Sequence, residues 1–228
     1  MAIGWDDVRA AVESRPAARV AEAVRSRAAV AVILREAAAG LEILFIRRAE
    51  HPDDPWSGQM AFPGGRAEPG DSDLAGTAAR ETLEETGIDL TRDAELLGPL
   101  DEVRAMARLR PMDLTITPFV FRLRAPVEPA LSDEVRSLHW LALDELLSPE
   151  LRSTMEYPHR DAVLRFPCLR VQDLVIWGLT YRMFLGLLER MGLPPATAAP
   201  LAAEAASAAT GTEPAPGTSA AGEAARGR

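Results

Sequence analysis

The chain has 228 residues, of which 47% are hydrophobic and 26% are charged, a balance typical of a globular protein and not of a disordered or membrane-spanning one. Its formal net charge of −9 disfavours a nucleic-acid-binding surface, and all of its 25 basic residues are arginines, which excludes a Schiff-base lysine and a P-loop lysine. Cys168 is the only cysteine, so the sequence excludes an intrachain disulfide and a zinc site built on several cysteines.

The sequence carries no signal for export or for membrane insertion. Its start lacks the basic and apolar regions of a secretory signal peptide. Its longest apolar stretch, residues 171–188, is interrupted by polar and charged residues. We therefore expect a cytoplasmic protein with no membrane partner, which agrees with the single cysteine.

The two ends of the chain differ from its centre. Residues 194–228 are almost entirely Ala, Pro, Gly, Ser, Thr and Glu, so they cannot bury enough apolar surface to offset the entropy of ordering, and we expect a disordered tail. Residues 1–193 fit one domain with one core. Residues 1–27 are expected to form an N-terminal helical segment, either two short helices or one helix broken at Pro16.

Two strands and a long loop follow in chain order. The apolar runs at residues 28–34 and 41–46 predict buried strands joined by a polar turn that ends at Gly40. Residues 51–76 are rich in Pro, Gly and Asp. A loop of that length usually carries function.

The segment at residues 74–86 is expected to be a helix, because it is rich in Ala, Leu and Glu and is followed by Gly87, a residue suited to a helix C-cap. Further strands are expected at residues 94–100, 114–123 and 135–141. Further helices are expected at residues 143–147 and 172–191. Helices mixed with strands, without regular βαβ alternation, predict an α/β fold in which a mixed sheet lies between helices.

Three glutamates share one face of the helix expected at residues 74–86, because Glu81, Glu84 and Glu85 stand at positions i, i+3 and i+4. Arg80 can neutralise Glu84, but Glu81 and Glu85 remain a like-charge pair. Taken alone, these residues are most simply interpreted as a solvated, charged helix face. Clustered carboxylates are also the hard oxygen ligands that Mg²⁺ or Mn²⁺ prefers.

A glycine-rich loop upstream favours the metal interpretation. In Phe62-Pro63-Gly64-Gly65, the two glycines permit a tight backbone that can bring a carbonyl oxygen close to the same metal. On its own, Pro-Gly-Gly predicts only a turn.

Together these residues resemble the Nudix box, the family pattern GX5EX7REUXEEXGU in which U is bulky and apolar. Its second half is matched, with Thr82 at the first U position, by Arg80, Glu81, Glu84, Glu85, Gly87 and Ile88. The first half departs from the pattern, because fourteen residues separate Gly65 from Arg80 where the pattern has thirteen. The role of the first box glutamate is therefore open between Glu68, Asp71 and Asp73.

A one-residue expansion of this kind resembles the branch of the family that includes coenzyme A pyrophosphatases. The run from Gly58 to Gly65 is similar to that branch's upstream signature, which ends GX3FPGG. The segments 117–120 and 176–180 resemble its central strand and its closing helix. The signature has an arginine four residues before its first glycine, and this chain has Asp54 there.

The resemblance implies a Nudix α/β/α sandwich and a metal-dependent site. Glu81, Glu84 and Glu85, with the Gly65 carbonyl, are then the ligands of Mg²⁺ or Mn²⁺, which would polarise a diphosphate and activate water. Arg80 is expected to orient Glu84 or a neighbouring carboxylate. Two residues are candidates for the catalytic base: Glu81 in the box and Glu134 in a later loop.

The residues expected to contact substrate are Arg47, Arg48, Gly64 and Arg104. Arg104 belongs to a cluster with Arg108 and Arg110 on an expected loop. The simpler interpretation is that these side chains are solvated surface charges, and the more specific one is that they bind a phosphate.

The expected activity is hydrolysis of the pyrophosphate bond of a nucleoside diphosphate linked to another group. Coenzyme A, cleaved to 3′,5′-ADP and 4′-phosphopantetheine, is the first candidate substrate, and ADP-ribose or a dinucleoside polyphosphate is the alternative. A non-catalytic Nudix-fold binding module is the alternative from another class. The partner is then a small nucleotide, not nucleic acid, and a homodimer is left open as the assembly.

Overall fold

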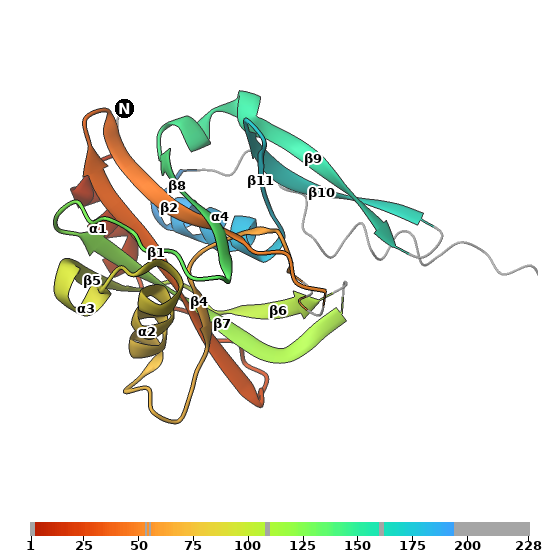
Figure 1. Cartoon of the computed structure of the whole chain (residues 1–228). Coiled ribbons are helices and arrows are strands. Elements are labelled where there is room, and N and C mark those ends of the chain that lie inside the picture. Colours follow the sequence, from red (N-terminus) through yellow and green to blue (C-terminus); the bar gives the residue numbers. More distant parts are fainter. Residues whose placement is uncertain (1–2, 53, 55, 108–109, 160–161, 194–228) are drawn as a thin grey trace, which may run out of the picture. The chain divides into compact units, whose positions relative to one another are not determined.

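A mixed sheet forms the centre of the protein (Figure 1). The computed structural model describes residues 3–52, 54, 56–107, 110–159 and 162–193. The strands of this sheet are β1 (Ser26–Ala37), β2 (Gly40–Arg48), β3 (Met60–Ala61), β4 (Gly64–Arg66), β5 (Ala94–Pro99), β6 (Val103–Ala107), β7 (Arg110–Leu123) and β8 (Val135–Ala142). Their main order is β3-β2-β1-β7-β5, with β4 paired to β1, β6 to β7 and β8 to β2. Strands β1 and β7 run parallel and the other pairs antiparallel, so the predicted mixed sheet is confirmed.

Side chains of β1 alternate between two hydrophobic cores, one on each face of the sheet. Val32 and Leu34 belong to the core that includes residues of α1 (Trp5–Glu13) and α4 (Gly178–Arg190). Ala31 and Ile33 belong to the core that includes residues of α2 (Leu74–Thr86) and α3 (Leu90–Asp93). The expectation of one core was therefore wrong, because a sheet covered by helices on both faces divides the apolar interior into two. The α/β/α arrangement itself is confirmed.

Helix α2 has the bounds that the sequence predicted. The Asp73 carboxylate caps its start by accepting a hydrogen bond from the Gly76 N–H at 2.8 Å. Gly87 ends the helix with a φ of 72°, a left-handed conformation in which a side chain is strained. The box glutamates are thus carried by a helix fixed at both ends.

The expected helix at residues 172–191 was wrong at its start. Residues Leu174–Trp177 form strand β11, and α4 begins only at Gly178. Strand β11 pairs antiparallel with β10 (Ala162–Val171), which in turn pairs with β9 (Arg152–His159). The run Leu-Val-Ile-Trp suits a strand, and cross-strand pairing overrides the helical spacing of its apolar residues. Figure 1 shows β9 and β10 as a long hairpin, which the sequence did not predict.

Other local predictions were partly confirmed. The N-terminal segment has one helix, α1, and no second helix before β1 within the described residues. The short helix expected near residues 143–147 is a 3-10 turn at Glu145–Leu147. The cluster expected on a loop was placed wrongly, because Arg104 lies in β6 and Arg110 begins β7. Arg108 lies outside the described residues. No helix in the described part of the chain is long and apolar enough to cross a membrane.

Arg190, near the end of α4, joins the N-terminal segment to the rest of the fold. Its side chain is 1% exposed and forms an ion pair with Asp101 at 2.7 Å. Its guanidinium also donates to the carbonyl oxygens of Val12 and Arg15, at 3.2 and 3.0 Å. The Arg15 side chain pairs with Asp101 as well, so one carboxylate holds two arginines from opposite ends of the domain.

The tail expected at residues 194–228 lies outside the described residues and stays a prediction. Ending the chain after Leu193 is expected to leave the melting temperature and the turnover number unchanged, because residues that bury no apolar surface add little to stability. Thermal melts and turnover of the full and shortened chains, measured side by side, test this. A clearly lower melting temperature for the shortened chain would mean that the tail packs on the domain.

Candidate active site

Strand β4 brings the glycine loop against α2 through three successive residues. The Gly64 N–H donates to Glu85 Oε2 at 2.9 Å. A Cβ atom built on Gly65 would lie 2.4 Å from the Glu81 carboxyl carbon. The Arg66 carbonyl oxygen accepts a hydrogen bond from Arg80 Nη2 at 3.0 Å. The loop and the helix that the sequence singled out are therefore one structural unit.

Glycine is required at both loop positions for different reasons. Gly64 has a φ of 147°, and a Cβ there would lie 2.3 Å from the backbone oxygen of Ala29 in β1. At Gly65 the space that a side chain would need is filled by the Glu81 carboxylate. The backbone of the loop can approach both β1 and α2 only because neither residue carries a side chain.

Arg80 is the centre of the carboxylate network. Its Nε donates to Asp71 at 2.8 Å, its Nη1 pairs with Glu84 at 3.0 Å, and its Nη2 pairs with Glu81 at 3.1 Å. The expectation that Arg80 orients Glu84 or a neighbouring carboxylate agrees with these contacts. One guanidinium thus fixes the side chains of two box glutamates.

Asp71 occupies the position that the sequence left open. Of the three candidates, it is the one whose carboxylate contacts Arg80, whereas Asp73 caps α2 and the Glu68 N–H donates to Asp71. Asp71 also accepts from the Thr77 hydroxyl at 2.7 Å. The Arg80 guanidinium, helped by these donors, holds the pKa of Asp71 well below its usual range. In this expanded box, the carboxylate before α2 that pairs with Arg80 is therefore that of Asp71.

The box glutamates differ in their surroundings. Glu85 is 3% exposed, whereas the side chain of Glu84 is 58% exposed. Burial raises the pKa of Glu85 to about 7, against the Gly64 N–H and Arg48, which lower it. Burial also raises the pKa of Glu81, against the effect of Arg80. The charges of Glu81 and Glu134 further raise the pKa of Glu85, so negative charge is in excess here.

The loop that carries Glu134 is tied to the end of α2. The Ser132 N–H donates to the Glu85 carbonyl oxygen at 3.1 Å, and the Ala49 N–H donates to the Glu134 carbonyl oxygen at 2.8 Å. The Glu134 carboxylate is exposed, and its charge raises the pKa of both Glu81 and Glu85. The second candidate base is therefore near enough for its charge to act on the same two box glutamates.

The donor set fits a divalent cation in chemistry. Glu81 and Glu85 offer hard oxygen atoms, and a cation would offset both the burial and, to a smaller extent, the mutual repulsion that raise their pKa values. Within the described residues, no three carboxylate, imidazole or thiol groups stand close enough together to hold an ion as they are placed. Glu84 is turned to Arg80, and Glu85 is engaged by Gly64. Joint coordination by Glu81, Glu84 and Glu85 stays a prediction.

A cleft of about 250 Å³ adjoins the β4 backbone. Its apolar wall includes Trp56, Met60, Phe62, Leu179 and Met183. Its charged residues are Arg48, Asp54 and Arg66. The cleft therefore offers apolar surface next to the loop that holds Glu81 and Glu85.

Of the three arginines expected to contact substrate, only Arg48 lines the cleft. Arg48 lines the cleft, but its guanidinium pairs with Asp54 at 2.8 Å and faces Glu85 at 3.7 Å. Arg104 is not part of the cleft wall. Its guanidinium pairs with Glu22 and donates to the Met112 carbonyl oxygen at 3.1 Å. Arg47 also lies outside that wall. Arg66, which the sequence reasoning missed, lines the cleft; its position directly after Gly64-Gly65 was the available signal.

Sequence comparison identifies a family and several relatives. The NUDIX domain model matches residues 25–165. An uncharacterized Nudix hydrolase, NudL, of Yersinia pestis (strain Pestoides F) is 31% identical over 157 residues, which cover 66% of this chain and 73% of that protein. An uncharacterized protein of Schizosaccharomyces pombe is 40% identical over 119 residues, which cover 50% of this chain and 36% of that protein. This chain thus spans only about a third of the length of the yeast relative.

Structure comparison finds more distant likenesses. The Ap4A hydrolase of C. elegans has 24% sequence identity and a TM-score of 0.44, over 53% of this chain and 82% of that chain. A MutT/nudix family protein from Enterococcus faecalis has 18% identity and a TM-score of 0.49, over 79% of this chain and 66% of that chain. Likenesses of this degree say nothing about the substrate.

The residues that the family model matches include β4, α2 and Glu134, so the carboxylate network lies within the match. The match also covers more than half of the chain. The Yersinia relative is itself named a Nudix hydrolase, and the match covers 73% of its length. The chain therefore belongs to the Nudix family of hydrolases, which act on pyrophosphate bonds.

Proposed function

We propose that this chain hydrolyses the pyrophosphate bond of a nucleoside diphosphate linked to another group, with Mg²⁺ or Mn²⁺ as the cofactor. One observation carries the proposal: Gly64, Gly65 and Arg66 contact Glu85, Glu81 and Arg80 in turn. This arrangement fixes two acidic side chains against a backbone that can approach a ligand closely, because glycines form it. A non-catalytic binding module has no need for a buried glutamate, Glu85, next to a half-buried one of like charge, Glu81.

The residues of the network are proposed to bind the metal, to position the glutamates or to accept a proton. Glu81, Glu84, Glu85 and the Gly65 carbonyl are the proposed metal ligands, and the bound cation supplies charge neutralisation on the diphosphate. Arg80, held by Asp71, keeps Glu81 and Glu84 in place. Glu81 or Glu134 accepts the proton of the attacking water as its oxygen bonds to phosphorus. The bridging P–O bond then breaks, and its electron pair leaves with the second phosphate.

Coenzyme A is the proposed substrate within this class. The loop sequence that ends in Gly64-Gly65 resembles the signature of coenzyme A pyrophosphatases, and an apolar cleft next to it suits the pantetheine arm. Asp54, which replaces an arginine of that signature, forms an ion pair with Arg48. Its negative charge is therefore offset, and it presents less repulsion to a phosphate than its sequence position suggested.

An enzyme selective for coenzyme A is expected to prefer it over 3′-dephospho-CoA by roughly 10- to 150-fold in kcat/KM, because a charge-assisted contact to the 3′-phosphate contributes about 1.5–3 kcal/mol. The test measures kcat/KM for coenzyme A, 3′-dephospho-CoA and ADP-ribose on one preparation with Mg²⁺ and with Mn²⁺, and identifies the products by mass. Acyl-CoAs, NADH and diadenosine polyphosphates complete the panel. If ADP-ribose is the best of the three by tenfold or more, the coenzyme A assignment is wrong and the broader one stands.

A further inference from the structure

We propose that Arg66 binds the diphosphate of the substrate and is the cation that brings this group to the box glutamates. The inference rests on the proposed function and adds to it a residue for substrate binding. It follows from how the two arginines of the cleft, Arg48 and Arg66, are partnered.

Arg48 is committed to partners within the protein. Its Nε and Nη2 both bond to Asp54 Oδ2, at 2.9 and 2.8 Å, and its Nη1 lies 3.7 Å from Glu85 Oε1. The other Asp54 oxygen accepts from the Trp56 N–H at 2.9 Å, which fixes the carboxylate in turn. Two carboxylates thus offset the charge of Arg48, and a phosphate would have to displace Asp54 to reach it in full.

Arg66 differs from Arg48 in having no ion pair within the described residues. It is exposed and lines the cleft. Its backbone is nevertheless fixed, since its carbonyl oxygen accepts from Arg80 and its strand register places it opposite Ala28 in β1. The guanidinium is therefore available to a ligand, on a main chain that is held by strand pairing and by the hydrogen bond from Arg80.

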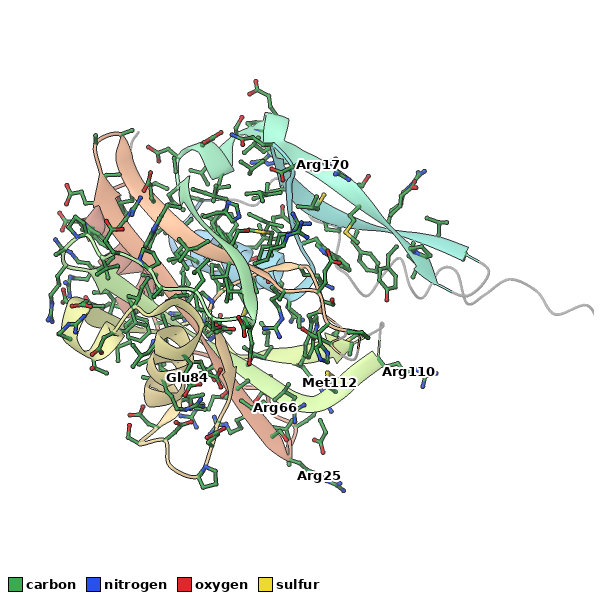
Figure 2. The ribbon with its side chains drawn as sticks, viewed as in Figure 1. Arg25, Arg66, Glu84, Arg110, Met112 and Arg170 are labelled. Atoms are coloured by element: carbon green, nitrogen blue, oxygen red, sulfur yellow. The ribbon has the colours of Figure 1, made fainter. Side chains whose placement is uncertain are left out.

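The side chain of Arg66 stands on the cleft face of β4. Residues paired across an antiparallel ladder project to the same face, so Arg66 shares the face of Ala28, which also lines the cleft. Gly65, the preceding residue, has its missing side chain directed at Glu81 on the α2 face. One three-residue strand thus presents a cation to the cleft and a bare backbone to the acidic helix. Figure 2 labels Arg66 and Glu84, and the Arg66 carbonyl oxygen accepts a hydrogen bond from Arg80 of the helix that carries Glu84.

The charge balance of the site favours a second positive group beside the proposed metal ion. Glu81, Glu84 and Asp71 share the single guanidinium of Arg80, and Glu85 shares Arg48 with Asp54. A diphosphate bound against the Gly64-Gly65 backbone, which lines the cleft and adjoins Glu81 and Glu85, meets this excess of negative charge. A guanidinium can hold two phosphate oxygens through its planar fork, which makes Arg66 suited to offset that repulsion.

The test compares Arg66→Gln, Arg66→Lys and the control Arg124→Gln. Arg124 is also exposed and has no side-chain ion pair within the described residues, but it follows the end of β7 that is away from Leu114 and Ile116, the two β7 residues of the cleft wall. We would measure KM and kcat on the best substrate of the panel, the affinity for ADP with Mg²⁺ by calorimetry, and the melting temperature.

Arg66→Gln is expected to raise KM and weaken ADP binding, each by roughly 10- to 100-fold, with an unchanged melting temperature. Arg66→Lys should recover part of both losses because it keeps the charge but not the fork, and Arg124→Gln should match the parent protein. Unchanged KM and ADP affinity in Arg66→Gln would overturn the proposal while leaving the hydrolase function intact. If the parent protein hydrolyses no compound of the panel but binds ADP, and Arg66→Gln weakens that binding, the proposed function fails and the phosphate-binding role of Arg66 stands. If it neither hydrolyses these compounds nor binds ADP, both are wrong.

Discussion

Replacing Glu81 or Glu85 by glutamine is expected to lower kcat by a factor of roughly 100 or more, equivalent to about 2.7 kcal/mol of transition-state stabilisation. Glutamine keeps the shape of each side chain but removes the negative charge that a divalent cation requires. Glu81 lies against Gly65, and Glu85 accepts from the Gly64 N–H, so both changes act where the loop meets α2. The fold should persist, because neither substitution changes side-chain volume.

The measurement is kcat with Mg²⁺ and with Mn²⁺, together with a thermal melt of each variant. Glu128→Gln, an exposed residue of the loop before β8, is the matched control and should retain full activity. Excess EDTA should abolish hydrolysis by the parent protein. Hydrolysis that continues unchanged in EDTA, or in both glutamine variants, would refute the metal-dependent mechanism.

Gly65→Ala is expected to lower kcat by roughly tenfold to a hundredfold with little change in melting temperature. The added methyl group would lie 2.4 Å from the Glu81 carboxyl carbon, closer than such atoms can approach. The carboxylate ends a flexible side chain, so it can move aside at small cost in stability, but it then leaves its position near Arg80 and against Gly65. A displacement of about 1 Å in a catalytic group can cost about a hundredfold in rate.

Gly70→Ala is the control for this substitution, since a Cβ at Gly70 meets no atom within 4 Å. Activity and melting temperature of both variants should be measured under the same conditions. Equal turnover for Gly65→Ala and Gly70→Ala would mean that the position of Glu81 against the loop is not needed for catalysis.

Features with a strong local signal could be predicted from the sequence. Helix α2 was predicted at its observed bounds because helix-favouring residues fill it and Gly87 ends it. Strands β1 and β2 were predicted from continuous apolar runs, which a sheet buried on both faces requires. The contact of Glu81 with Gly65 agrees with the motif spacing, although a spacing alone gives no distance.

Features that depend on distant partners could not be predicted in the same way. The segment Leu174–Trp177 has apolar residues compatible with either a helix or a strand, and its pairing with β10 decides between them. The choice of Asp71 over Glu68 and Asp73 depends on which carboxylate reaches Arg80, and counting residues through an expanded motif cannot supply that. The sequence predicted Arg48 and not Arg66 as a substrate contact, because the ion pair that joins Arg48 to Asp54 cannot be inferred from residue types.

Arg190 also determines how much of the chain must be made for the domain to fold. The family match begins at residue 25, yet the carbonyl oxygens of Val12 and Arg15, which bind the Arg190 guanidinium, precede it. A shorter chain limited to the matched residues would also end before Arg190. It would therefore lack both arginines, Arg15 and Arg190, that pair with Asp101. Cutting only the N-terminal segment would leave a buried guanidinium without several of its acceptors, which is costly. The boundaries of the folding unit are therefore expected to be wider than those of the family match, and expression of residues 25–165 alone should yield an unstable product.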